Sequence, residues 1–157
     1  MLRFERTNSQ SPEFINLVLQ LDIELGERDG AEHSFYQQYN KIDAIRYALV
    51  AFDEDEPVGC GALKVFNDET MEIKRMFVPE EYRGKGVASQ ILRELESWSL
   101  DLGYSTCILE TGKRQPEAIQ LYKKSGYEVI PNYGQYAGVE NSMCFEKSLA
   151  DMDKKDE

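Results

Sequence analysis

Residues 82–88, Tyr-Arg-Gly-Lys-Gly-Val-Ala, place two glycines and two cations directly before a run of helical periodicity. Backbone N–H groups at a helix N-terminus are unpaired and together carry about half a positive charge, which attracts anions. Glycine lets the backbone approach a ligand without interference from a Cβ atom, and Arg83 and Lys85 add mobile positive charge. The segment therefore indicates a phosphate-binding turn, with a purely structural tight turn as the alternative. It matches neither the P-loop pattern nor the three-glycine dinucleotide fingerprint.

The chain offers little for metal or thiol chemistry. Its three cysteines, Cys60, Cys107 and Cys144, lie far apart among apolar neighbours, and His33 is its only histidine. This spacing matches no zinc or redox motif, and a nucleophilic cysteine would need a histidine nearby. We therefore expect no metal and interpret the thiols as buried side chains in a reducing cytoplasm.

The charge balance narrows the classes of partner. Eighteen Lys and Arg against 29 Asp and Glu give a net charge of −11, which argues against binding to nucleic acid or to an anionic membrane. No apolar run approaches the ~20 residues that span a bilayer, and the first residues lack the apolar stretch of a signal peptide. We expect a cytoplasmic protein whose acidity concentrates cationic small molecules or serves solubility alone.

Helix and strand signals follow one another along the whole chain. Ser11 and Pro12 predict the start of a helix over residues 12–28, and a shorter helix is expected over residues 35–42. Two later helices begin after the glycine turn and at Pro116, and they end at Gly103 and Gly126. Apolar runs predict strands over residues 2–6, 47–52, 58–66, 71–78, 106–109, 127–130 and 143–145.

This order predicts one α/β domain over residues 1–149, a size that can close a single core. A strand–helix–strand crossover lies inside an otherwise antiparallel plan. It favours a mixed sheet, mostly antiparallel with one parallel strand pair, and helices on both faces. Residues 150–157 are charged and poor in apolar side chains, so we expect a frayed acidic tail.

The pattern Arg83-x-x-Gly86-x-Ala88 resembles the (Gln/Arg)-x-x-Gly-x-(Gly/Ala) signature of the GNAT superfamily of N-acetyltransferases. The similarity extends to the strand before the signature (72–78), the strand after its helix (109–111), and the closing helix and turn (116–127). The predicted element order is also that of the family, so the resemblance covers essentially the whole fold. It implies that the parallel strands around Phe77 and Leu109 splay apart at mid-length.

The resemblance implies acetyl-CoA as co-substrate. The backbone from Arg83 to Ala88 would hold the pyrophosphate, and the strand at Phe77 would pair with the pantetheine arm and polarise the thioester carbonyl. Gln115 departs from the family pattern, because many members carry Asn before the proline of the last helix. The implied cofactor-binding residues are Met76, Phe77, Val78, Arg83, Gly84, Lys85, Gly86, Val87, Ala88, Ser89 and Gln115.

Attack of an amine on a thioester needs a neutral amine, a stabilised oxyanion and a proton for the departing thiolate. Tyr122 matches the family position whose hydroxyl lies beside the coenzyme sulfur, which implies a general acid; a helix residue packing on the sheet is the alternative. Glu72 stands where histone-type members carry a catalytic glutamate. It could act as base if burial raises its pKa or a water relays the proton. A solvated strand residue paired with Lys74 or with a basic residue of a neighbouring strand is the alternative, and Glu110 is the fallback base. Strand alternation predicts Glu72, Lys74, Met76 and Val78 on one face and Ile73, Arg75 and Phe77 on the other.

Two segments are candidates for the acceptor site. Residues 131–141 form a long loop with two tyrosines and Glu140, and residues 29–36 join the first two helices and include Glu32 and His33. Aromatic rings and carboxylates would suit a cationic amine. The predicted substrate-binding residues are His33, Tyr133, Tyr136 and Glu140; for His33 a structural role is the alternative.

The expected function is acetyl transfer from acetyl-CoA to a primary amine of a small molecule, by direct attack in a ternary complex. A protein or peptide N-acetyltransferase and a non-catalytic acyl-CoA sensor stay open. The long loop at Tyr133 favours a closed pocket over an open groove, and Tyr122 with Glu72 favours an enzyme over a sensor. The acceptor and the oligomeric state, a homodimer included, are not fixed by the sequence.

Overall fold

The computed structural model of the chain describes residues 1–29 and 45–150. The helix predicted over residues 35–42, the candidate residues Glu32 and His33, and the tail after residue 150 lie outside the described residues.

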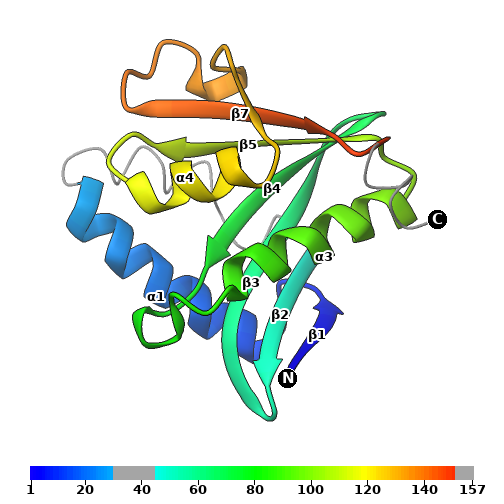
Figure 1. The fold of residues 1–157 in the computed structure, drawn as a ribbon, viewed down its shortest axis with the longest axis vertical. Coiled ribbons are helices and arrows are strands. Elements are labelled where there is room, and N and C mark those ends of the chain that lie inside the picture. The colour runs from blue at the N-terminus through cyan, green and yellow to red at the C-terminus, as the bar shows by residue number, and fades with distance from the viewer. Residues whose placement is uncertain (30–44, 151–157) are drawn as a thin grey trace.

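Seven strands of the described residues form one sheet in the order β1-β2-β3-β4-β5-β7-β6 (Figure 1). The strands are β1 (Leu2–Thr7), β2 (Tyr47–Asp53), β3 (Glu56–Asn67), β4 (Thr70–Phe77), β5 (Thr106–Gly112), β6 (Glu128–Ile130) and β7 (Ser142–Ser148). The helices are α1 (Pro12–Asp29), α3 (Val87–Asp101) and α4 (Pro116–Lys124), with 3-10 turns η3 (Glu80–Tyr82) and η4 (Gly134–Tyr136). Each strand and helix predicted within the described residues is present, with ends that differ by only a few residues.

The sheet is mixed, as predicted. The neighbouring strands pair antiparallel except β4 and β5, which pair in parallel from Thr70 and Thr106 to Ile73 and Leu109. Beyond that point β4 continues along β3 to Phe77, while β5 continues along β7 to Gly112. The two strands therefore diverge, and the sheet opens as a V between β4 and β5 (Figure 1).

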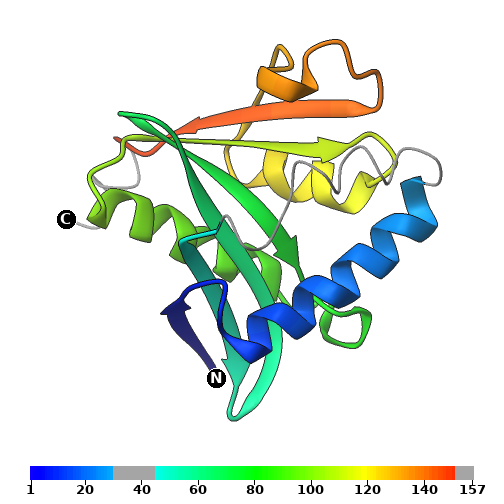
Figure 2. The ribbon, with the colours of Figure 1, turned by 180° about the vertical axis from the view of Figure 1, so that it is seen from behind.

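Helices cover both faces of the sheet. Helix α3 lies on one face and α1 on the other, which Figures 1 and 2 show from opposite sides. The α3 face depends on two glycines of β3: a Cβ atom on Gly59 would lie 2.6 Å from Ile91 Cδ1, and one on Gly61 would lie 2.6 Å from Leu95 Cδ1. A side chain at either position would force these methyl groups to move, so glycine favours the close approach of α3 to the sheet. Helix α1 begins where predicted, because the Phe14 N–H donates to Ser11 Oγ at 3.2 Å.

A β-bulge in β4 makes the predicted alternation of that strand wrong. Cys60 pairs with Phe77 but Ala62 pairs with Lys74, so β4 carries one extra residue, and Arg75 adopts a left-handed φ of 58°. Met76 and Val78 pack with Ile73 in the core beneath α3. Glu72 and Lys74 instead share the α1 face with Phe77.

No helix within residues 1–29 and 45–150 is long and apolar enough to cross a membrane.

Candidate active site

A cleft of about 410 Å³ lies between the end of β4, the N-terminus of α3 and helix α4. It collects ten of the eleven residues that the family resemblance implied for the cofactor: Met76, Phe77, Val78, Arg83, Gly84, Gly86, Val87, Ala88, Ser89 and Gln115. Lys85 belongs to the same turn but its exposed side chain does not line the cleft. Tyr122 lines the cleft from α4.

The turn before α3 presents backbone donors to this cleft. Gly84 and Gly86 have φ values of 79° and 81°, and Gly86 is the N-cap of α3. Among the described residues, the amide N–H groups from Gly84 to Ser89 donate no backbone hydrogen bond. These free donors lie at the positive end of the α3 dipole, so the arrangement fits a phosphate group.

The side chain of Arg83 is held in place, whereas mobile charge was expected there. Its Nε donates to the Val78 carbonyl oxygen at 2.7 Å, and its Nη2 contacts both carboxylate oxygens of Glu24 in α1, at 2.7 and 2.9 Å. The guanidinium thus ties α1 to the end of β4 beside the turn. Lys85, which is exposed, remains as the mobile cation.

A second cavity of about 110 Å³ lies at the mouth of the V between β4 and β5. It adjoins the larger cleft, because the two are lined in common by Leu21, Met76, Gln115, Ala118 and Tyr122. The larger cleft lies beside the free backbone N–H groups of the glycine turn, and the smaller cavity is lined by ionisable side chains. The two therefore meet at Tyr122.

Tyr122 combines a packed ring with a protonated hydroxyl. Its side chain is buried, and its ring centroid lies 5.9 Å from those of Tyr127 and Phe145. Burial raises the pKa of the hydroxyl above its ordinary value, and the Glu110 carboxylate raises it further. The hydroxyl therefore stays protonated at neutral pH, as a proton donor must.

Glu72 is buried at the floor of the second cavity and is not the solvated strand residue of the alternative interpretation. The Tyr133 hydroxyl donates to its Oε2 at 2.7 Å, and Lys74 Nζ lies 3.8 Å from its Oε1. Lys74 Nζ also lies 3.5 Å from the hydroxyl of Tyr136, a residue that lines the cavity. Strand alternation before the bulge places Glu72 and Lys74 on one face, and the loop tyrosines contact both.

Burial changes the acid–base chemistry of this cluster. It lowers the pKa of the Lys74 ammonium, with Glu72 acting in the opposite direction. It raises the pKa of the Tyr133 hydroxyl, and the adjacent Glu72 carboxylate raises it further. The tyrosine thus stays a hydrogen-bond donor to Glu72.

The structure does not bring Glu140 to this cluster. Glu140 is exposed and lines neither cavity, and His33 lies outside the described residues. Of the four predicted substrate-binding residues, Tyr133 and Tyr136 lie beside Glu72.

Arg75 and its partner Asp22 were missed by reasoning from the sequence. Arg75 lines the second cavity, and its Nη1 donates to Asp22 Oδ1 at 2.9 Å. Within residues 1–29 and 45–150, its buried Nε has no hydrogen-bond partner. A buried donor without an acceptor costs about 1–3 kcal/mol. Nothing in the sequence indicated this role, because regular alternation predicts Arg75 on the face of the sheet opposite to Glu72.

The described residues contain no group of three His, Cys, Asp or Glu side chains that could hold a metal ion. The three thiols are free and buried, as expected. Burial raises the pKa of Cys60 and Cys107 to about 12 and that of Cys144 to about 11. A thiolate nucleophile is therefore disfavoured at all three positions.

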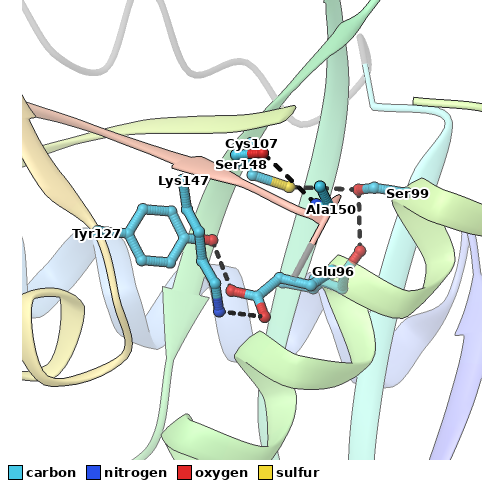
Figure 3. A network of polar contacts seen from close by, with 8 residues as sticks. Glu96, Ser99, Cys107, Tyr127, Lys147, Ser148 and Ala150 are labelled. Carbon is cyan, nitrogen blue, oxygen red and sulfur yellow. Dashed lines mark hydrogen bonds and ion pairs between the residues drawn. The ribbon is translucent and has the colours of Figure 1, made fainter. Parts of the chain in front are cut away.

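A buried polar cluster links α3 to the side of the sheet that contains β6 and β7 (Figure 3). Glu96 of α3 is 1% exposed; it accepts a hydrogen bond from the Tyr127 hydroxyl at 2.8 Å, and Lys147 Nζ of β7 lies 3.0 Å from its carboxylate. Helix α3 packs on β2, β3 and β4 in one arm of the V and also on β5 in the other, so this contact with β7 adds a polar link to the second arm.

The mixed sheet splays between β4 and β5, and a turn with free backbone N–H groups lies beside the opening. These are the features of the α/β acyltransferases that the sequence resembles. The family model described as "Acetyltransferase (GNAT) family" matches residues 13–127. The chain belongs to this family and is an N-acetyltransferase.

The relatives agree with this assignment. The chain is 34% identical over 139 residues to the IAA acetyltransferase of Azospirillum brasilense, covering 86% of this chain and 90% of that protein. A solved structure from Klebsiella pneumoniae, assigned to the acyl-CoA N-acyltransferases, has a TM-score of 0.80 at 27% identity and covers 95% of this chain and 98% of its own. A GNAT family acetyltransferase from Elizabethkingia anophelis, solved with acetyl-CoA bound, shares the fold with a TM-score of 0.69 at 19% identity, over 94% of this chain and 98% of that one.

Proposed function

We propose that this chain binds acetyl-CoA in the larger cleft and transfers its acetyl group to a primary amine of a small molecule bound in the smaller cavity. The observation that carries the proposal is the junction of the two hollows at Met76, Gln115 and Tyr122. An acyl donor and an acceptor in these positions would meet at a protonated tyrosine. Direct attack in a ternary complex follows, because each substrate has its own hollow.

The cofactor would be held mainly by main-chain groups. The free N–H groups from Gly84 to Ser89 would bind the pyrophosphate, and residues 76–78 would pair with the pantetheine arm. The register between β3 and β4 skips Arg75 and Met76, so main-chain groups at the bulge are turned out of the ladder. The N–H groups among them are candidates for stabilising the oxyanion of the tetrahedral intermediate.

Two proton transfers complete the proposed reaction. Tyr122 would protonate the departing thiolate, and Glu72 would accept the proton of the amine, directly or through a water. Glu110 lines the same cavity and accepts a hydrogen bond from Ser142 Oγ at 2.7 Å, which makes it the second candidate base. Release of coenzyme A and an N-acetylated amine balances the reaction.

Initial-rate kinetics on a panel of primary amines test this proposal. Release of the coenzyme A thiol should depend on the amine, and double-reciprocal plots should intersect, as expected for a ternary complex. Parallel plots would indicate an acetyl-enzyme intermediate and contradict direct attack. Binding of acetyl-CoA without amine-dependent release would instead support the acyl-CoA sensor.

A further inference from the structure

The cavity beside the cofactor cleft is lined by charges of both signs, although a cation-binding site was expected from the sequence. Glu72 and Glu110 contribute carboxylates, and Lys74 and Arg75 contribute cations. We propose that the acetyl acceptor is a small amino carboxylate, with its ammonium group near the two glutamates and its carboxylate bound by Arg75. This inference rests on the proposed function, because it names the acceptor class of the same site.

Arg75 has the donor geometry that a carboxylate requires. Its side chain is 5% exposed, and its Nη1 is occupied by Asp22 at 2.9 Å. Its Nε has no acceptor among the residues that the structure describes. A guanidinium presents planar donors that match a carboxylate bidentately, so the edge formed by Nε and Nη2 suits a second anionic partner. A side-chain adjustment on ligand entry, which is common at binding sites, would open Nε to that partner.

The β-bulge directs this arginine toward the cavity. In a regular strand Arg75 would share a face with Ile73, which packs in the core beneath α3. The left-handed φ of 58° instead turns the side chain to Asp22 on α1. This conformation is unfavourable for a residue with a Cβ atom, and such strain gathers at functional sites.

The remaining charges favour a carboxylate over a phosphate as the anionic group. Lys74 Nζ lies 3.8 Å from Glu72 Oε1 and 3.5 Å from the Tyr136 hydroxyl, whereas Arg75 keeps one donor, Nε, that has no acceptor among the described residues. Two carboxylates in a space of about 110 Å³ would repel a dianion more strongly than a monoanion. The volume suits a compact head group, so the rest of the acceptor would extend out of the cavity.

Matched acceptors test the inference. For several L-amino acids, kcat/KM would be measured by coenzyme A release and compared with the corresponding amine that lacks the carboxylate and with the amino acid amide. Hydrogen bonds to a charged group predict that the amino acid exceeds both by about 10- to 100-fold.

Three variants assign the preference to Arg75. In Arg75→Gln the ratio of amino acid to amine kcat/KM should fall toward 1, mainly through a higher KM for the amino acid. Arg75→Lys, which keeps the charge and loses the planar fork, should lower the ratio partly. Arg93→Gln, on the exposed side of α3, should keep the wild-type ratio. The thermal shift with acetyl-CoA verifies folding, and the lysine variant carries the test if the glutamine variant does not fold.

Equal turnover of amino acids and carboxylate-free amines would overturn the inference and leave the proposed function standing. An unchanged ratio in both Arg75 variants would also overturn it. If acetyl-CoA binds but no acceptor of either kind releases coenzyme A, the proposed function fails and this inference fails with it.

Discussion

Replacing Gly86 with valine should separate acetyl-CoA binding from folding. Gly86 has a φ of 81°, and among the described residues a Cβ atom there would meet only Gln90 Nε2, at 3.9 Å. The cost to the fold is therefore backbone strain without a clash, about 1–2 kcal/mol. For a chain of this length that lowers the Tm by about 2–8 °C. Binding should suffer more, because losing one or two charge-assisted hydrogen bonds costs about 1.5–3 kcal/mol each.

The assay is the thermal shift induced by acetyl-CoA. At a ligand concentration of about 100 Kd the wild type should gain about 2.7 kcal/mol, which is about 5–11 °C. A Kd about a hundredfold weaker leaves about 0.4 kcal/mol of that gain at the same concentration. Gly138→Val is the matched control: its φ is also 81°, no atom of the described residues lies within 4 Å of its Cβ position, and it lines neither cavity.

A wild-type shift in Gly86→Val would refute the phosphate-binding turn. Loss of the shift in Gly138→Val as well would show that general strain, and not the turn, weakens binding.

Other variants test the remaining parts of the site. Tyr122→Phe keeps the ring packing and removes the hydroxyl, so kcat should fall by about 10²-fold with little change in the acetyl-CoA thermal shift; full activity would remove the general acid. Glu72→Gln should flatten the acidic limb of the pH–rate profile, since that limb reports the ionised base. The profile must also be measured with an acceptor amine of different pKa. If the acidic limb shifts with the pKa of the acceptor and is the same in wild type and Glu72→Gln, Glu72 is excluded as the base. Lys147→Met should lower the free energy of unfolding by about 3 kcal/mol in urea, because Glu96, 1% exposed, loses its cation. Arg3→Gln, which breaks an exposed ion pair with Glu5, should cost less than about 1 kcal/mol, and equal losses would contradict the role of burial.

Local patterns in the sequence were sufficient for the elements and for the glycine turn. Apolar runs with turn residues between them locate each described strand, and Pro12 and Pro116 mark helix starts because proline fits the first helical position. The splay between β4 and β5 came only from the resemblance, since no local pattern reports where two strands stop pairing.

The charged partners across the fold could not be predicted. The bulge depends on a left-handed φ at Arg75, a conformation for which arginine carries no sequence signature. The pairs Arg75–Asp22 and Arg83–Glu24 join β4 and the turn to α1 over long sequence separations. Periodicity shows which face of an element a residue takes, but it does not show which side chain meets it from another element. Glu140 was selected by loop composition alone, and the fold leaves it exposed.

The most direct test of the central claim is the stoichiometry of the reaction in a mixture of the purified chain, acetyl-CoA and the best acceptor of the panel. Free coenzyme A thiol would be measured by a colorimetric assay and the N-acetylated product by mass spectrometry. The proposed function predicts equal amounts of both, formed only when the amine is present. Thiol release that is the same without the amine, or that yields no N-acetylated product, would contradict it.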